Sequence, residues 1–118
     1  MLTKAVYVLF FSIVASIAMA DESSVQAGFN QKYQDYFGTN SQSLLPFTSM
    51  EKTDWKKLQA SSPLKVVFVE PDKYYISKLY TLTMYQAADD GLYYLDVKGG
   101  FWGMDDLIYG PISAKELQ

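Results

Sequence analysis

The chain has 118 residues, of which 49% are hydrophobic and 16% aromatic, and its formal net charge is −3. That length suits one small domain with its own core. All ten cations are Lys, and the chain contains no Cys, His or Arg. These absences exclude disulfides, thiolate nucleophiles, imidazole bases, thiolate or imidazole metal ligands and guanidinium clamps.

Residues 1–20 have the pattern of a cleavable signal peptide. An apolar run of about 13 residues follows Lys4, and Ala18-Met19-Ala20 supplies the small-x-small motif of a cleavage site. The run is shorter than the roughly 17–25 residues that span a bilayer, and a polar stretch follows it. We therefore expect a mature domain, residues 21–118, with no membrane span.

The composition of this expected mature chain indicates its compartment. Nine Lys stand against thirteen acidic residues, so the net charge is −4. The chain has no Cys for a disulfide and no Asn-x-Ser/Thr sequon, and both absences favour a bacterial periplasm over a eukaryotic secretory pathway. Without a Cys at the cleavage point, a lipoprotein is excluded. We expect an acidic, cysteine-free periplasmic protein.

The first helix is expected directly after the cleavage point. Ser23 and Gln26 have the spacing of a capping box. Gly28 weakens a helix in isolation, so packing against the rest of the domain must stabilise it. Apolar residues recur at helical spacing and predict a buried stripe made of Val25, Phe29, Tyr33, Tyr36 and Phe37.

A second, shorter helix is expected before the first strand. It begins near Thr48 or Thr53 and carries Trp55, and Ser61-Ser62-Pro63 ends it. The consecutive lysines of this helix, Lys56-Lys57, are expected on its solvent side.

The second half of the chain has an extended pattern. Residues 65–69 are nearly continuous in β-branched and aromatic side chains, and residues 70–72 are a turn signal. Residues 75–86 and 92–98 are expected to form a hairpin. Residues 107–109 fit either a final edge strand or one helical turn, halted by Gly110-Pro111.

These elements predict the fold class. We expect an α+β domain in which one or two helices pack on an antiparallel sheet of three or four strands. In the first strand of the hairpin, alternation places Ile76, Tyr80, Leu82 and Met84 on one face.

Adjacent acids offer the enzyme route that remains without His, but their spacing argues against it. Asp89-Asp90 lies in a turn, where Asp is favoured for local hydrogen bonds, and Asp105-Asp106 points its carboxyls to opposite faces of an extended chain. The glycines of residues 99–103 match no phosphate-binding loop, and the acidic balance disfavours nucleic acid. We expect no enzyme activity, cofactor or metal.

Surplus aromatic residues point instead to a binding surface. Some of the pairs Tyr74-Tyr75 and Tyr93-Tyr94 should place one ring outward, because neighbours in a strand alternate faces. Glycines around Phe101-Trp102 give this segment a flexible backbone. The candidate partner-binding residues are Phe101, Trp102, Asp105, Asp106 and Tyr93. The alternative is that residues 101 and 102 fold back as a lid on the core.

Several functions fit this composition. The first is a periplasmic protein that binds and neutralises a partner protein of basic character, as an immunity or inhibitor protein does against an envelope-targeting toxin or hydrolase. The alternatives are a peptidoglycan- or glycan-binding module, an accessory subunit of an envelope assembly, and a small hydrolase acting through carboxylates. Identity of the partner and oligomeric state are not encoded in any motif.

Overall fold

Helices and strands follow one another along residues 22–118, which are the residues that the computed structural model describes. The expected signal peptide, residues 1–20, lies outside them. In chain order the elements are α2 (Glu22–Tyr33), the 3-10 turn η1 (Gln34–Tyr36), β1 (Ser49–Met50), α3 (Lys52–Ser61), β2 (Leu64–Tyr75), β3 (Lys78–Ala87), β4 (Tyr93–Gly99), the 3-10 turn η2 (Phe101–Gly103), β5 (Asp105–Ile112) and the 3-10 turn η3 (Ala114–Leu117).

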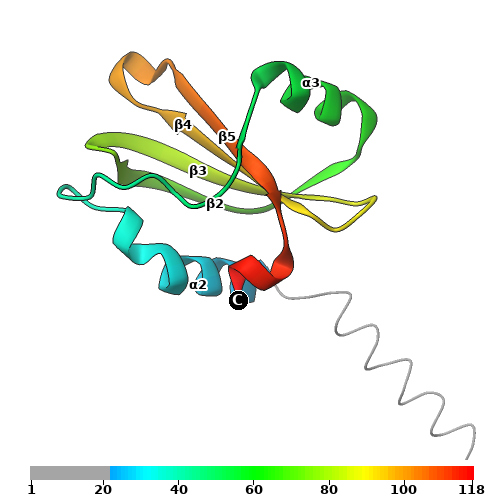
Figure 1. Ribbon diagram of the computed structural model, residues 1–118, viewed down its shortest axis with the longest axis horizontal. Coiled ribbons are helices and arrows are strands. Elements are labelled where there is room, and N and C mark those ends of the chain that lie inside the picture. Colours follow the sequence, from blue (N-terminus) through cyan, green and yellow to red (C-terminus); the bar gives the residue numbers. More distant parts are fainter. Residues whose placement is uncertain (1–21) are drawn as a thin grey trace, which may run out of the picture.

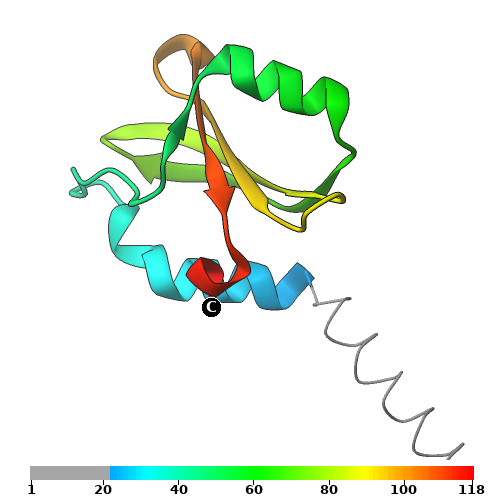
Figure 2. The same cartoon turned by 45° about the vertical axis from the view of Figure 1, so that its right-hand side comes forward.

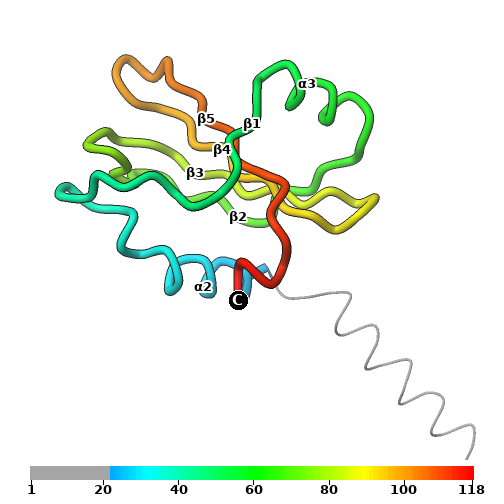
Figure 3. Tube along the Cα trace, in the orientation of Figure 1, coloured from blue at the N-terminus to red at the C-terminus, as the bar shows by residue number. Residues whose placement is uncertain are grey.

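The five strands form one antiparallel sheet in the order β1-β5-β4-β3-β2 (Figures 1 and 3). The α+β class is confirmed, but the expected three or four strands are five. The additional strand is β1, which pairs with Tyr109 and Ile108 of β5. Two residues are too few to show the alternation by which a strand is recognised. β5 itself is a strand that continues through Gly110-Pro111, where the sequence predicts a stop.

The turn between β2 and β3 lies further along the chain than the sequence predicts. Residues 70–72 do not end the strand; β2 continues through them with an irregular register. The chain reverses instead at Ile76 and Ser77, whose φ angles are 49° and 66°. Because β2 is an outer strand, it tolerates Pro71, which has no N–H to give to a ladder. Asp72, at φ 59°, accommodates the bulge.

The helix α2 and the turn η3 cover one face of the sheet (Figure 2). The main core lies between them and side chains of β2, β3, β4 and β5. The predicted apolar stripe of the helix faces this core and is confirmed: Phe29 and Tyr33 are buried, and Val25, Tyr36 and Phe37 pack at its margin. In β3, Tyr80, Leu82 and Met84 face the same core as predicted, whereas Ile76, expected on the same strand face, lies in the turn before β3 and packs at the margin of the core.

Gly28 lets the C-terminal turn pack directly on α2. A Cβ at this position would overlap the backbone carbonyl oxygen of Leu117. Beside it, the Tyr33 hydroxyl donates a hydrogen bond to the carbonyl of Glu116. A glycine that weakens the isolated helix is therefore required by the packing that stabilises the helix in the domain.

The helix α3 covers one end of the opposite face of the sheet (Figure 1). The buried Trp55 ring lies 5.5 Å from the ring of Tyr85 and 5.8 Å from that of Tyr94, between ring centroids. Ala87 and Ile108 complete this smaller core. The predicted second helix is confirmed, and its two consecutive lysines are exposed as expected.

The two consecutive tyrosine pairs behave differently. In the first pair Tyr74 is exposed and Tyr75 is fully buried, as alternation predicts. In the second pair both Tyr93 and Tyr94 are buried, so this pair places no ring outward. The reason is that β4 passes between two cores, and each ring enters a different one.

Candidate functional site

The connection between β4 and β5 exposes three large apolar side chains. Phe101 is 67% exposed, Trp102 84% and Met104 79%. We call these three residues the tip cluster. The two aromatic rings contact each other edge to face, with centroids 5.4 Å apart and planes at 88°. Because both rings are largely exposed, Phe101 and Trp102 do not fold back as a lid on the core.

The backbone of the tip is held in an unusual conformation. Trp102 has φ 62°, a left-handed value that is costly for a bulky side chain. The preceding Gly100 donates its N–H to the carbonyl of Leu79 on β3, at 2.9 Å. A Cβ on Gly100 would overlap the Asp105 carboxylate. Gly100 therefore permits a close approach of the Asp105 side chain, rather than the backbone flexibility that the sequence predicts.

Asp105 fastens the end of the tip to the neighbouring strand. Its Oδ2 accepts a hydrogen bond from the Tyr80 hydroxyl at 3.2 Å and lies 3.4 Å from Lys78 Nζ. Burial first, and then the Asp105 carboxylate, raise the pKa of the Tyr80 hydroxyl. The sequence predicts that Asp105 contacts a basic partner protein. In the structure its carboxylate instead interacts with Tyr80 and Lys78 of the same domain.

The remaining two predicted site residues lie away from the tip cluster. Tyr93 is only 4% exposed and belongs to the main core under α2, so its hydroxyl and ring are not part of this surface. Asp106 directly follows Asp105, but its side chain lies on the sheet face that α3 partly covers, opposite Lys98 of β4. The structure thus brings together Phe101, Trp102 and Asp105 and separates Tyr93 from them.

A carboxyl pair that the sequence does not reveal joins β4 and β5 on that same face. Asp96 lies diagonally across from Asp106, close enough to share a hydrogen bond. Burial, followed by the hydrogen bond and charge of Asp106, raises the pKa of Asp96 to about 7, against the opposing charges of Lys98 and Lys52. The two acids are ten residues apart in the chain, and only the register of β4 and β5 brings them together. The available signal is Asp96 itself, a charge between the fully buried Leu95 and Val97 of β4.

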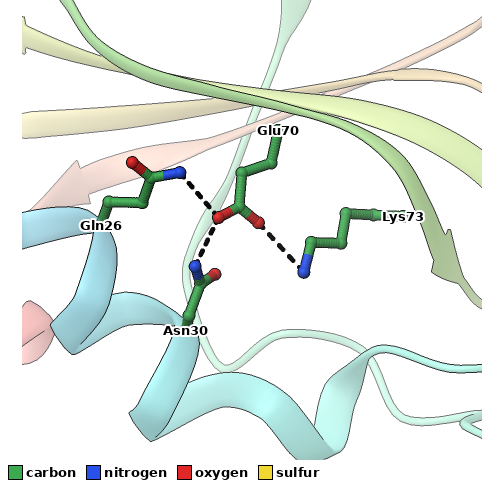
Figure 4. A network of polar contacts seen from close by, with 4 residues as sticks. All are labelled: Gln26, Asn30, Glu70 and Lys73. Carbon is green, nitrogen blue, oxygen red and sulfur yellow. Dashed lines mark hydrogen bonds and ion pairs between the residues drawn. The ribbon is translucent and has the colours of Figure 1, made fainter. Parts of the chain in front are cut away.

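The buried carboxylate of Glu70 ties α2 to β2 (Figure 4). Gln26 Nε2 donates to its Oε1 at 2.8 Å, and the Asn30 side-chain amide donates to the same oxygen. Lys73 Nζ lies 3.0 Å from Oε2. Burial raises the pKa of Glu70, but the two amides and Lys73 outweigh it and hold the pKa below its usual value. The side-chain nitrogens of Gln26 and Asn30 on α2 both point at the Glu70 carboxylate, so this network holds the helix in place.

The acids of the β3–β4 turn have local partners, as expected for a turn. Ser62 Oγ donates to Asp89 at 2.9 Å, and the Leu92 N–H donates to Asp90 at 3.0 Å. Within residues 22–118, no group of three or more acidic side chains is placed to hold a metal ion. No helix in this part of the chain is long and apolar enough to cross a membrane.

Comparison with known proteins assigns no family: no protein-family model matches the chain, and no curated protein or solved structure matches it significantly.

Proposed function

We propose that this domain is an exported binding protein that holds and neutralises a partner protein, in the manner of an immunity or inhibitor protein against an envelope-targeting toxin or hydrolase. The observation that supports the proposal is the tip cluster, three large apolar side chains that are each more than two-thirds exposed. Trp is enriched among residues that dominate the energy of protein interfaces, where it fills a pocket of the partner.

Because the tip cluster is exposed, its side chains add little hydrophobic stabilisation to the free domain. Phe101 and Trp102 contact each other, yet most of both rings faces water. Single exposed apolar residues are ordinary on protein surfaces, but a group of them beside one another is typical of an interaction site. Burial of these rings against a partner would supply the favourable free energy that the free domain lacks.

The tip is also held in a fixed shape before any partner arrives. Asp105 fastens it to Lys78 and Tyr80, and Gly100 hydrogen-bonds to the backbone of β3. A side chain that is already positioned loses little conformational entropy on binding. In this account Asp105 positions the anchor, and the rings of Phe101 and Trp102 make the contact.

The partner's basic character is proposed from the charge of the whole domain. The tip's own acid is paired within the domain, but the expected mature chain has a net charge of −4. A net charge of one sign attracts an oppositely charged partner over long range and raises the association rate. The signal-peptide pattern of residues 1–20 supports the periplasm as the place where the two proteins meet.

The proposal is tested by photo-crosslinking in an envelope extract of the source cells. One variant carries a photo-reactive phenylalanine analogue in place of Trp102, and a matched control carries it in place of Val66, which is half-exposed on β2. We expect a single protein adduct from position 102 and none from position 66. Excess wild-type protein should abolish the adduct, whereas excess Trp102→Ala should compete poorly.

Two outcomes would overturn this function. Equal adducts from both positions, or equal competition by Trp102→Ala and wild type, would show that the tip does not recognise a partner protein. Sedimentation with purified peptidoglycan, lost in Trp102→Ala, would favour the glycan-binding alternative. The perpendicular rings of the tip argue against that alternative, because they do not offer one continuous flat platform for a sugar.

A further inference from the structure

The carboxyl pair of Asp96 and Asp106 has a feature that the proposed binding function does not use. The Oδ1 atoms of both side chains are shielded from solvent, and no hydrogen-bond donor within residues 22–118 reaches either of them. A buried carboxylate oxygen without a donor is costly. One proton shared between the two groups would lower that cost, because it removes one negative charge and supplies a hydrogen-bond donor between them.

The positive charges around the pair do not fully neutralise the two carboxyls. On α3 the first residue, Lys52, is exposed, as is Lys98 on β4, and their charges only partly offset those of the carboxyls. On β3 the Tyr85 ring lies near both acids, and its hydroxyl pKa is raised by burial and then by their charges. Among the residues that β1 and β2 place on this face, Met50, Leu64, Val66 and Val69 are apolar and carry no charge.

The position of the pair connects it to three elements. Asp96 lies on β4, Asp106 on β5, and Lys52 begins the helix α3 that covers this face. The ring of Trp55, one turn further along α3, packs on Tyr85. Repulsion between two ionised carboxyls would therefore act on the β4–β5 pairing and on the seat of α3 together.

We propose that Asp96 and Asp106 form a proton-dependent latch, which one shared proton closes and which loosens the seating of α3 and the β4–β5 pairing when both groups are ionised. The direction follows from linkage. The pKa of Asp96 is raised from 3.8 to about 7, so the folded domain keeps a proton that the unfolded chain has lost. The stabilisation is complete below about pH 4 and is lost as the pH rises through about 7.

The test replaces the shared proton by a permanent donor. In Asp96→Asn the amide donates to Asp106 at every pH, so its melting temperature should be constant between pH 5 and pH 8. The wild type should lose several degrees over the same range and melt below Asp96→Asn at pH 8. Asp35→Asn is the matched control, because it removes one exposed acid and should keep the wild-type slope.

Two further measurements test the latch without relying on the stability of Asp96→Asn alone. Carbon-13 NMR of the wild-type side-chain carboxyls should show one group of the pair titrating near pH 7, and Asp106→Asn should abolish that titration. Hydrogen exchange of α3 amides, corrected for intrinsic rates, should be faster at pH 8 than at pH 6 only in the wild type. Carboxyls that both titrate near pH 4, or equal melting slopes in the wild type and Asp96→Asn, would overturn the latch.

Discussion

At the scale of single residues, Trp102 combines two unfavourable properties. Its ring is 84% exposed, and its φ of 62° lies in a region that side chains with a Cβ rarely adopt. Neither property stabilises the folded domain. Residues held in such conformations are concentrated at functional sites, where the surrounding structure maintains the strain. The combination is what the binding proposal explains and what packing does not.

This interpretation makes a prediction that compares two substitutions of one residue. Trp102→Gly and Trp102→Ala both remove the exposed ring, but only glycine adopts a φ of 62° without strain. We expect Trp102→Gly to be more stable than Trp102→Ala by about 0.5–1 kcal/mol. Urea unfolding of the two purified variants measures this difference. An alanine variant as stable as the glycine variant would show that the tip backbone is unstrained.

Residue-level prediction from sequence succeeds where the signal is local. Large rings between glycines mark Phe101 and Trp102 without knowledge of the sheet. The pair formed by Asp96 and Asp106 has no local signal, because ten positions separate the two residues and only strand register joins them. The burial of Tyr93 has no local signal either, because it depends on an α2–η3 layer that a strand pattern does not reveal.

At the scale of elements, the Glu70 network decides how firmly α2 is held on the sheet. The pKa of Glu70 is below its usual value of 4.5. The network therefore stabilises the folded domain fully above about pH 4.5, and this stabilisation is lost as the pH falls through the lowered pKa. We expect Glu70→Gln to cost about 1–2 kcal/mol at pH 7, because the buried ion pair with Lys73 is broken. The cost should disappear in strong acid.

A matched control separates this buried contact from ordinary surface charge. Glu22→Gln breaks the exposed ion pair with Lys65, and we expect it to cost no more than about 0.5 kcal/mol at any pH. Denaturant unfolding at pH 7 and at pH 3 measures both variants. A Glu70→Gln variant as stable as the wild type at pH 7 would contradict the role of the network.

The sequence predicts the helices and strands in which apolar residues recur over several turns or alternations. It does not predict elements of one or two residues. The helix stripe, the short helix with Trp55 and the hairpin of β3 and β4 each repeat a pattern over several residues. The strand β1 has two residues and no period. The true β2–β3 turn contains Ile76 and Ser77, whereas Pro71 and Asp72 are stronger turn residues and misplace it.

At the scale of the whole molecule, one sheet contributes to two separate cores, and the tip cluster lies at one end of it. The helix α2 covers one face and α3 part of the other, with the tip cluster beyond the pairing of β4 and β5 (Figure 1). The core is thus complete without the tip rings. A binding anchor in this place can change without loss of the fold.

The affinity of the captured partner for Trp102→Ala tests this separation of fold and function most directly. We expect binding to weaken by about 30-fold or more, equivalent to about 2 kcal/mol, since a buried interface Trp is removed. Val66→Ala, which shortens a half-exposed side chain on β2, should leave the affinity unchanged. A Trp102→Ala variant that binds as tightly as the wild type would contradict the proposed anchor.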